Sequence, residues 1–457
     1  MTLPTSSPAS LGLDPARLQR LELWMEQQVQ QNRVAGASVL LARMGATGFF
    51  KATGLARPAT EQGDGQPFDR DTLVRLYSMT KPVTAVAAMM LYEQGHFQLD
   101  DPLAWYIPAF ASTPVWDGTV PASDPEDSDA ILRHVVPQQS PITVRQVMTH
   151  TAGLTYSFMN ATPVDRYYRD HGLDFPGADT PLAELVERLA SAPLLCQPGS
   201  QWNYSVASDV LGRLVEIWSG EPLDEYFQNR IFEPLGMRDT GFHVRSGDEG
   251  RLADLLMPAT GGDLGSIGTT ESALTQAPGK VSSAQAASRG LRHEPPQVID
   301  PAASSSFLQA PALLSGGGGL TGSIDDYARF AQMLLNGGEL DGQRLLSGKT
   351  VDFMCRNHLP GNGDMASMGQ AVWSETSYNG IGFGLGFAVM LDPVEAQMLG
   401  SAGECHWGGA ASTFFWIDPK EELLVVFLTQ LYPSSSYPMR RELRTAVYQA
   451  AMELPLS

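Results

Sequence analysis

The sequence predicts an α+β protein in which one antiparallel sheet, flanked by helices, lies beside a mainly helical lobe. Three observations lead to this prediction. Strand-like runs occur near the N-terminus and again near the C-terminus, helix-like stretches fill the middle, and a helix closes the chain. If the first and last strands share one sheet, the helical middle must form a separate lobe, with a cleft between the two.

The chain opens with a helix and two strands. Asp14 and Pro15 begin a helix that runs towards Gln31, because aspartate suits the N-cap and proline suits the first helical position. Residues 34–43 are mainly apolar and predict a strand. Residues 48–51, which contain two phenylalanines, predict the start of its partner across a short turn.

The middle of the chain is predicted to be helical. The alanine-rich stretch from Val83 to Glu93 indicates a buried helix that Gly95 terminates. Further helices are expected at residues 143–148, 182–190, 206–218 and 222–231. Residues 246–312 are rich in Gly, Ser, Ala and Pro, and they predict a long surface excursion or lid rather than a regular element.

The last third of the chain returns to strands. A helix is expected from Ser323 to Asn336, because Ser323 can cap it and Asp325 and Asp326 suit the positive end of its dipole. Residues 382–390, 413–417 and 423–429 predict strands, and a final helix runs from Met439 to Met452. The expected division is an α/β lobe of residues 1–75 and 313–457, a helical lobe of residues 76–245, and an insertion at residues 246–312.

Composition and charge narrow the classes of function. The chain has 457 residues, of which 43% are hydrophobic, and this is enough for a substantial core. A net charge of −20 argues against nucleic acid and anionic membrane surfaces as partners, since both attract cationic proteins. No long apolar run predicts a membrane span, and the N-terminus lacks the features of a signal peptide, so we expect a cytoplasmic protein.

Cysteine and histidine usage indicates neither a disulfide framework nor a metal centre. Cys196, Cys355 and Cys405 are odd in number and far apart, with no CxxC spacing. His150, Cys405 and His406 are conceivable ligands, but the chain has no HExxH motif, and ordinary packing is the better interpretation. We therefore expect no metal, and no organic cofactor is implied either.

The clearest chemical motif is Ser78-Met79-Thr80-Lys81, at the start of the helix that ends near Glu93. On a helix, side chains three residues apart lie on one face, so the hydroxyl and the amine can meet. A lysine that is partly desolvated can lose its charge and take the proton of a serine nucleophile. Of the five lysines, only Lys81 has a serine three residues before it. The alternative is that Ser78 only caps the helix and Lys81 is solvated.

Acyl transfer also needs a proton route to the leaving group and donors for the oxyanion. Tyr204 ends the turn Pro198-Gly199-Ser200-Gln201-Trp202-Asn203, and a phenol there can reach a cleft and move protons beside a lysine. Its alternative role is packing. Residues 405–413 contain Gly408 and Gly409 beside a strand, where small residues let a substrate approach the backbone. A free N–H there, with that of Ser78, can form an oxyanion hole, and the alternative is a strand entry shaped by packing alone.

These stretches together resemble the serine β-lactamase and penicillin-binding-protein-like superfamily, and within it the class C-like branch that contains the family VIII carboxylesterases. The resemblance covers residues 11–450 apart from the insertion. It includes the flank Pro82-Val83-Thr84 after Lys81 and four further segments: His150-Thr151-Ala152-Gly153-Leu154, Gly317-Gly318-Gly319-Leu320, Phe232-Glu233-Pro234-Leu235-Gly236-Met237 and Trp416-Ile417-Asp418-Pro419.

The resemblance implies roles for single residues. Ser78 matches the acylated serine, Lys81 its base, and Tyr204-Ser205-Val206 the tyrosine motif, so Tyr204 completes the acid–base unit. Trp407-Gly408-Gly409 matches the third, substrate-binding motif. This register makes the N–H groups of Ser78 and Ala410 the oxyanion donors. A register shifted by one, His406-Trp407-Gly408, makes Gly409 the second donor.

Two departures from the β-lactamases point to a substrate class. Their third motif carries a lysine that helps bind a carboxylate, whereas tryptophan stands here, and the second motif ends in Val206 rather than asparagine. An uncharged wall favours a neutral ester. We therefore predict a serine carboxylesterase for small to medium-chain esters, with a small-molecule ester as its partner and no prediction for the oligomeric state. The alternatives are an acyltransferase acting on an alcohol or amine, an amide or β-lactam hydrolase of weak activity, and a non-catalytic binding protein.

Overall fold

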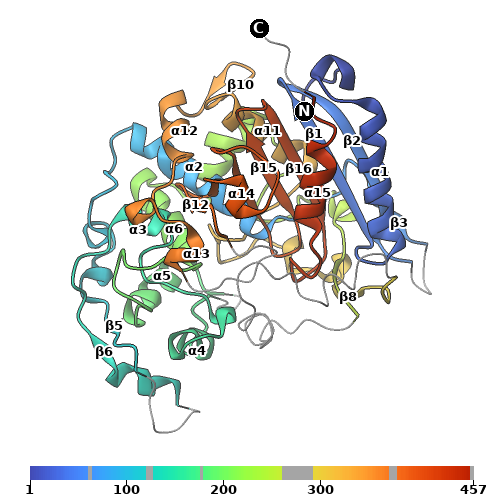
Figure 1. Cartoon of the computed structure of the whole chain (residues 1–457). Coiled ribbons are helices and arrows are strands. Elements are labelled where there is room, and N and C mark those ends of the chain that lie inside the picture. The colour runs from blue at the N-terminus through green and yellow to red at the C-terminus, as the bar shows by residue number, and fades with distance from the viewer. Residues whose placement is uncertain (60–63, 120–126, 175–178, 260–291, 370–377, 453–457) are drawn as a thin grey trace.

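The computed structural model describes residues 1–59, 64–119, 127–174, 179–259, 292–369 and 378–452 (Figure 1). Its centre is an eight-stranded antiparallel sheet with the order β12-β13-β14-β15-β16-β1-β2-β3. Strand β1 pairs with β16, which brings Ala37 opposite Thr429. Strands from both ends of the chain therefore form one sheet, as the predicted fold class requires. The bounds are β1 Gly36–Arg43, β2 Ala46–Arg57, β3 Gln66–Pro67, β12 Ile381–Phe383, β13 Ala388–Met390, β14 Cys405–Gly408, β15 Phe414–Asp418 and β16 Leu423–Thr429.

Helices cover both faces of this sheet. Successive side chains of a strand point to opposite sides, so an apolar strand contributes to a core on each face. On β1, Val39 and Leu41 belong to the core formed with α1 (Pro15–Gln30) and α15 (Met439–Tyr448). Leu40 belongs to the larger core on the other face, which includes α2 (Thr80–Glu93) and α11 (Ile324–Leu335). Figure 1 shows α15 and α1 together beside β1 and β2. The larger core joins the sheet to the helical lobe.

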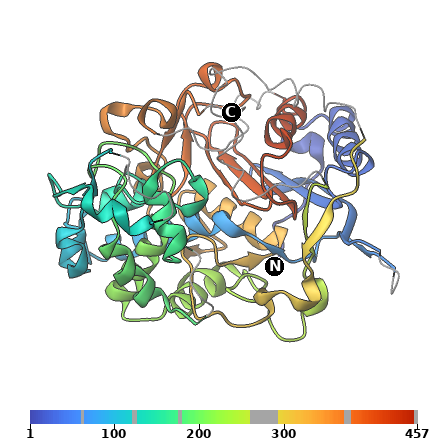
Figure 2. The ribbon, with the colours of Figure 1, turned by 90° about the horizontal axis from the view of Figure 1, so that it is seen from below.

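The helical lobe lies to one side of the sheet (Figure 2). Its helices are α3 Val144–Met148, α4 Pro163–Asp170, α5 Leu182–Ser191, α6 Ala207–Ser219, α7 Leu223–Phe227 and α8 Glu233–Leu235, and a π-helical turn, Gln228–Phe232, joins the last two. Helix α2 is buried along almost its whole length between lobe and sheet. Within the described part of the chain, no helix combines the length and apolar character needed to cross a bilayer.

Shorter elements complete the fold. The strand pairs are β4 Val74–Arg75 with β9 Thr321–Gly322, β5 Val115–Trp116 with β6 Val135–Val136, β7 Leu255–Met257 with β8 Gln297–Asp300, and β10 Glu339–Leu340 with β11 Gln343–Arg344. The remaining α-helices of the described residues are α12 Gly348–Met354, α13 Met365–Met368 and α14 Pro393–Ala396. Short 3₁₀ helices include Tyr77–Met79 and Leu103–Trp105.

Residues 382–390 form two strands rather than the single strand predicted. Strands β12 and β13 pair with each other across a turn that contains Gly386, whose φ is +100°. A Cβ on Gly386 would lie 2.2 Å from the Cβ of Ala85 on α2, so only glycine lets the turn sit there. The turn thus brings the sheet edge against α2. The last helix ends at Tyr448, earlier than predicted, and the helix expected over residues 222–231 is α7 followed by the π-helical turn.

The ends of the predicted insertion are regular, in contrast to the expected irregular excursion. Strands β7 and β8 pair antiparallel, and Arg75 of β4 binds β8 and the segment just before β7. The fully buried guanidinium of Arg75 lies 2.7 Å from Asp300 and donates to the carbonyl of Ala253 at 2.7 Å. A buried guanidinium is costly unless its donors are hydrogen-bonded, so these bonds are favoured to persist. They fix both ends of the insertion to β4. Residues 260–291, on which the rest of the expected lid falls, lie outside the described residues.

Asp326, in the first turn of α11, is a buried carboxyl whose ionisation opposes folding. It accepts hydrogen bonds from the N–H of Asp239 at 2.7 Å and the hydroxyl of Thr240 at 2.9 Å. Burial, and then the charge of Asp239, raise its pKa from 3.8 to about 6. The folded protein therefore holds this proton more tightly than the unfolded chain. The free energy of unfolding therefore decreases as the pH rises from about 4 to about 6, and it stays at the lower value above that range.

We expect Asp326→Asn to stabilise the fold above pH 6 by up to about 3 kcal/mol, the equivalent of two pKa units, and to have little effect near pH 4. The amide oxygen can accept the same two hydrogen bonds without the charge. Urea unfolding at several pH values measures the difference, with Asp224→Asn, an exposed first-turn aspartate, as the matched control. A variant less stable than the natural chain at pH 8 would contradict the expectation.

Candidate active site

Ser78 lies where a short strand turns into the buried helix α2. Tyr77, just before it, has a φ of +46°, a left-handed conformation that non-glycine residues adopt rarely. Where such residues do occur, they cluster at functional sites. The turn is fixed on both sides. The N–H of Leu76 donates to the carbonyl of Leu320 at 2.9 Å, and the hydroxyl of Tyr327 donates to the carbonyl of Met79 at 2.9 Å. This bracing holds Ser78, which is half-buried, at the start of the helix.

The amine of Lys81 makes three hydrogen bonds, the full number that an ammonium group can donate. It lies 3.3 Å from Ser78 Oγ, 3.1 Å from Tyr156 Oη and 2.8 Å from the carbonyl oxygen of Gly317. The predicted contact between Ser78 and Lys81 is therefore observed, with Ser78 in the 3₁₀ turn directly before α2. Lys81 is only 1% exposed. Its amine also lies 4.7 Å from the ring centroid of Tyr204. Protein groups, rather than bulk water, thus surround the amine of Lys81.

Tyr204 reaches the same serine from the other side. Its hydroxyl donates to Ser78 Oγ at 2.5 Å. The segment before it is held by backbone bonds, from Trp202 N–H to Met368 and from Asn203 N–H to His150. The ring of His150 lies 5.5 Å from that of Tyr204, and its Nδ1 lies 3.0 Å from the hydroxyl of Ser205. Burial, and then the charge of Lys81, lower the pKa of His150, which favours a neutral ring.

The third predicted motif lies on β14 and the turn after it. Trp407 is buried, and its ring lies 5.7 Å from Tyr204 and 5.3 Å from Phe383. Gly408 faces the opposite side, where a Cβ would lie 2.5 Å from the guanidinium of Arg440 on α15. This alternation is expected of a strand. Of the two glycines predicted to bind substrate, Gly408 thus lends the site only its backbone.

The turn after β14 lies directly against the segment that carries Ser78. A Cβ on Gly409 would lie 2.2 Å from the carbonyl oxygen of Leu76, so glycine is required for this approach. The N–H of Gly409 donates to the carbonyl of Thr413 at 2.9 Å and is therefore engaged in the turn. The N–H groups of Ala410 and Ser78 donate to no backbone carbonyl among the residues that the structure describes.

Sequence reasoning missed three residues around Lys81: Tyr156, Gly317 and Asp209. Tyr156 follows the segment 150–154 by two residues, and Gly317 belongs to the run of four glycines at residues 316–319. Both lie in or near segments that carry the family resemblance, but no spacing rule connects them to Lys81. Asp209 lies in Ser208-Asp209-Val210, which resembles the Ser-Asp-Asn motif of β-lactamases only superficially. The carboxylate of Asp209 accepts a hydrogen bond from the N–H of Gly317 at 3.1 Å.

Replacing Tyr156 by phenylalanine is expected to lower kcat/KM about 10–100-fold, because one buried donor of Lys81 then loses its acceptor at a cost of roughly 1.5–3 kcal/mol. Burial, and then the neighbouring Tyr204, raise the pKa of Tyr156, so its hydroxyl stays protonated. Steady-state kinetics with a p-nitrophenyl ester measures the effect. Tyr167→Phe, whose ring stacks on His171 away from Lys81, is the control. Unchanged kinetics in Tyr156→Phe would show that Lys81 does not need this partner.

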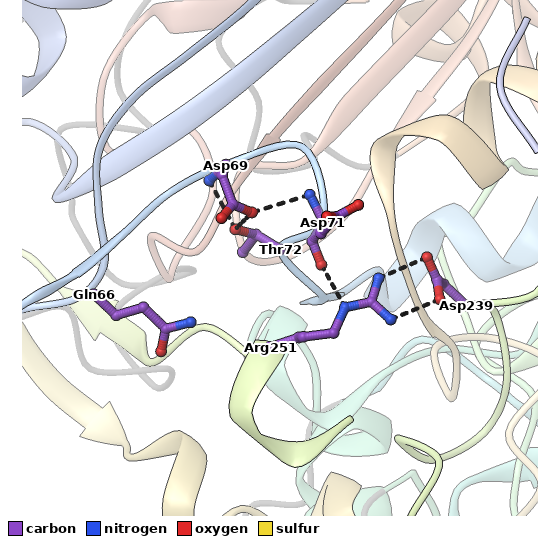
Figure 3. Close-up of a pocket in the computed structure, with 6 residues that line it drawn as sticks. All are labelled: Gln66, Asp69, Asp71, Thr72, Asp239 and Arg251. Carbon is purple, nitrogen blue, oxygen red and sulfur yellow. Dashed lines mark hydrogen bonds and ion pairs between the residues drawn. The ribbon is translucent and has the colours of Figure 1, made fainter. Parts of the chain in front are cut away.

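A separate hollow lies between residues 66–72 and residues 239–251, and it is lined by Gln66, Asp69, Asp71, Thr72, Asp239 and Arg251 (Figure 3). None of Ser78, Lys81 and Tyr204 lines it. Its charged groups bond to one another: Arg251 binds both carboxylate oxygens of Asp239 at 2.7 and 2.8 Å and donates to the carbonyl of Asp71 at 2.9 Å. These bonds connect residue 71 to residues 239 and 251 across the hollow.

The chain is similar to known proteins over most of its length. A family model described as Beta-lactamase matches residues 21–449. Esterase EstB of Burkholderia gladioli is 32% identical over 453 residues, which cover 98% of this chain and 100% of the relative. Lovastatin esterase of Penicillium rubens is 30% identical over 391 residues, covering 82% and 83%. The solved structure of EstCE1, described as a hydrolase with promiscuous acyltransferase activity, superposes with a TM-score of 0.70 at 28% identity and covers 95% of this chain and 99% of its own.

Proposed function

The chain belongs to the beta-lactamase family and is a serine hydrolase, and from this premise we propose that it is a carboxylesterase acting through an acyl-Ser78 intermediate. One observation carries the proposal. The hydroxyl of Tyr204 and the amine of Lys81 converge on Ser78 Oγ, at 2.5 and 3.3 Å. A serine approached by two groups that can move protons, in a half-buried position, is arranged for nucleophilic attack.

In the proposed first half-reaction, neutral Lys81 takes the hydroxyl proton of Ser78, and Ser78 Oγ attacks the ester carbonyl. The N–H groups of Ser78 and Ala410 stabilise the oxyanion, which preorganised donors do efficiently. The engagement of Gly409 N–H with Thr413 supports Ala410 rather than Gly409 as the second donor. The tetrahedral intermediate then collapses, and Tyr204 gives its proton to the departing alkoxide.

In the second half-reaction, water attacks the acyl-enzyme and gives a proton to the Tyr204 phenolate. As the ester bond to Ser78 breaks, Lys81 returns its proton to Ser78 Oγ. The free carboxylic acid leaves, and all three side chains regain their starting states. The cycle consumes one ester and one water and needs no other reactant.

The proposed substrates are neutral esters with small to medium acyl chains. Trp407 stands where the third motif of β-lactamases has a cation for the substrate carboxylate, and with Phe383 it presents aromatic surface beside Tyr204. Such a wall suits an uncharged acyl or alcohol group, since a charged group pays a desolvation cost there without compensation. We expect hydrolysis of amides and β-lactams to be weak at most.

Intact-protein mass spectrometry tests the proposal. The protein is mixed with p-nitrophenyl acetate or butyrate, quenched at short times, and digested to locate the added acyl mass. We expect one acyl group on the peptide that contains Ser78, together with release of p-nitrophenol. Turnover without any adduct on Ser78, or labelling of another residue at the same rate, would overturn the proposal.

Acyl transfer is the second candidate, because EstCE1, which shares this fold, is described as both a hydrolase and a promiscuous acyltransferase. The two activities differ only in what attacks the acyl-enzyme, water or an alcohol or amine. Adding an alcohol to the assay separates them. A transferase forms the new ester at the expense of the free acid at low alcohol concentration, whereas a hydrolase continues to yield mainly the acid.

A further inference from the structure

Asp209 is a buried acid in the first turn of α6, five residues after Tyr204. Its Oδ1 accepts a hydrogen bond from the hydroxyl of Ser315 at 2.6 Å and another from the N–H of Gly317 at 3.1 Å. The carbonyl of the same Gly317 accepts the 2.8 Å hydrogen bond of Lys81. One glycine therefore lies between the acid and the amine, with its N–H bound to the first and its carbonyl to the second.

Residues 316 and 317 can hold this position only as glycines. A Cβ on Gly317 would lie 2.8 Å from Asp209 Oδ2 and 3.1 Å from Tyr156 Oη. A Cβ on Gly316 would lie 2.5 Å from the carbonyl oxygen of Ser208. Contacts below 3 Å force a shift of one group or the other. The second carboxylate oxygen of Asp209 thus lies against the same side of Gly317 as the tyrosine that binds Lys81.

The other partners of Lys81 leave its positive charge unbalanced. Ser78, Tyr156 and Tyr204 are hydroxyls, and His150 is favoured in its neutral form. Burial raises the pKa of Asp209, whereas the hydrogen bond from Ser315, the charge of Lys81 and the bond from Gly317 oppose that rise. Asp174 is a further acid that acts on Tyr156. A buried cation is costly unless an anion compensates it.

We propose that Asp209 is the counter-charge of Lys81 and the positioning residue that seats the 315–317 loop, so that the carbonyl of Gly317 holds the amine beside Ser78. The catalytic part of this inference rests on the proposed function. As a carboxylate, Asp209 balances a positive charge on the amine of Lys81, so its removal is expected to let Ser78 react at lower pH. As a hydrogen-bond acceptor, it fixes the direction of the amine.

The first test measures how fast a fluorophosphonate probe labels Ser78 as a function of pH. In Asp209→Asn the acceptor is kept and the charge is removed, so the acidic limb of the profile is expected to move to lower pH by about one unit. Asp165→Asn is the matched control, because Asp165 is an equally buried acid that binds the Thr155 hydroxyl and the N–H groups of residues 161 and 162. Its limb is expected to coincide with that of the natural chain.

The second test needs no activity and remains informative if Asp209→Asn folds poorly. Melting temperatures are compared for Asp209→Asn, Lys81→Met and the double variant. A counter-charge predicts that Lys81→Met restores part of the stability lost in Asp209→Asn, because the double variant no longer buries an unbalanced cation. Losses that simply add would overturn the proposal.

The outcomes separate this inference from the proposed function. If Ser78 of the natural chain is labelled and the limb of Asp209→Asn does not move, the counter-charge role fails and the esterase proposal stands. If Ser78 is not labelled at all, the esterase proposal fails, and the melting temperatures alone decide whether Asp209 balances Lys81.

Discussion

Replacing Ser78 by alanine is expected to lower kcat for any ester substrate by about 10⁶-fold, the scale seen when a serine hydrolase loses its nucleophile. The reason is geometric. Ser78 Oγ is the point at which the Tyr204 hydroxyl and the Lys81 amine meet, at 2.5 and 3.3 Å. Without that oxygen no acyl-enzyme forms, and the remaining donors can only polarise a bound ester. Steady-state hydrolysis of p-nitrophenyl butyrate measures the loss.

Ser219→Ala is the matched control for Ser78→Ala. The hydroxyl of Ser219, at the end of α6, donates to the carbonyl of Val215 at 2.7 Å and accepts the N–H of Glu221 at 3.1 Å, so it lies in the same lobe and holds only the end of that helix and the turn after it. Its removal is expected to leave kcat unchanged. Circular dichroism checks that both variants are folded. If Ser78→Ala kept more than a small fraction of the natural rate, another residue would be the nucleophile.

Replacing Lys81 by methionine is expected to lower kcat by about 10⁴-fold, the upper range for the loss of a general base. Methionine keeps much of the length and apolar stem of lysine, so the buried path of the side chain stays filled. The acceptors at Tyr156 and Gly317 lose their donor, and Ser78 loses the group that takes its proton. Single-turnover acylation measured from pH 6 to pH 10 separates this step from the release of product.

Lys349→Met on the exposed side of α12 is the control for a general effect of removing a lysine. It is expected to leave acylation unchanged. An acylation rate in Lys81→Met within tenfold of the natural rate would assign the base to Tyr204 alone. In that case Tyr204→Phe should cost far more than Lys81→Met, and the same assay measures both.

Much of the fold could be predicted because local patterns decide it. The aspartate and proline at residues 14 and 15 begin α1 as expected, and Ser323 accepts the N–H of Asp326 at the start of α11. The error at residues 382–390 has a clear cause. That run contains alternating glycines, which suit a strand by spacing, but Gly386 has a positive φ and turns the chain against Ala85 of α2. A contact with a distant helix overrode the local pattern.

The sequence by itself indicated the pair Ser78 and Lys81, because side chains three residues apart on a helix lie on one face. It also indicated Tyr204 and Trp407 through motifs in order along the chain. Only the tertiary structure decided what surrounds the amine of Lys81. Its bonds to Tyr156 and Gly317 join residues 75 and 236 positions apart in the chain. Contacts between such distant residues arise from how sheet and lobe pack, and no local pattern encodes them.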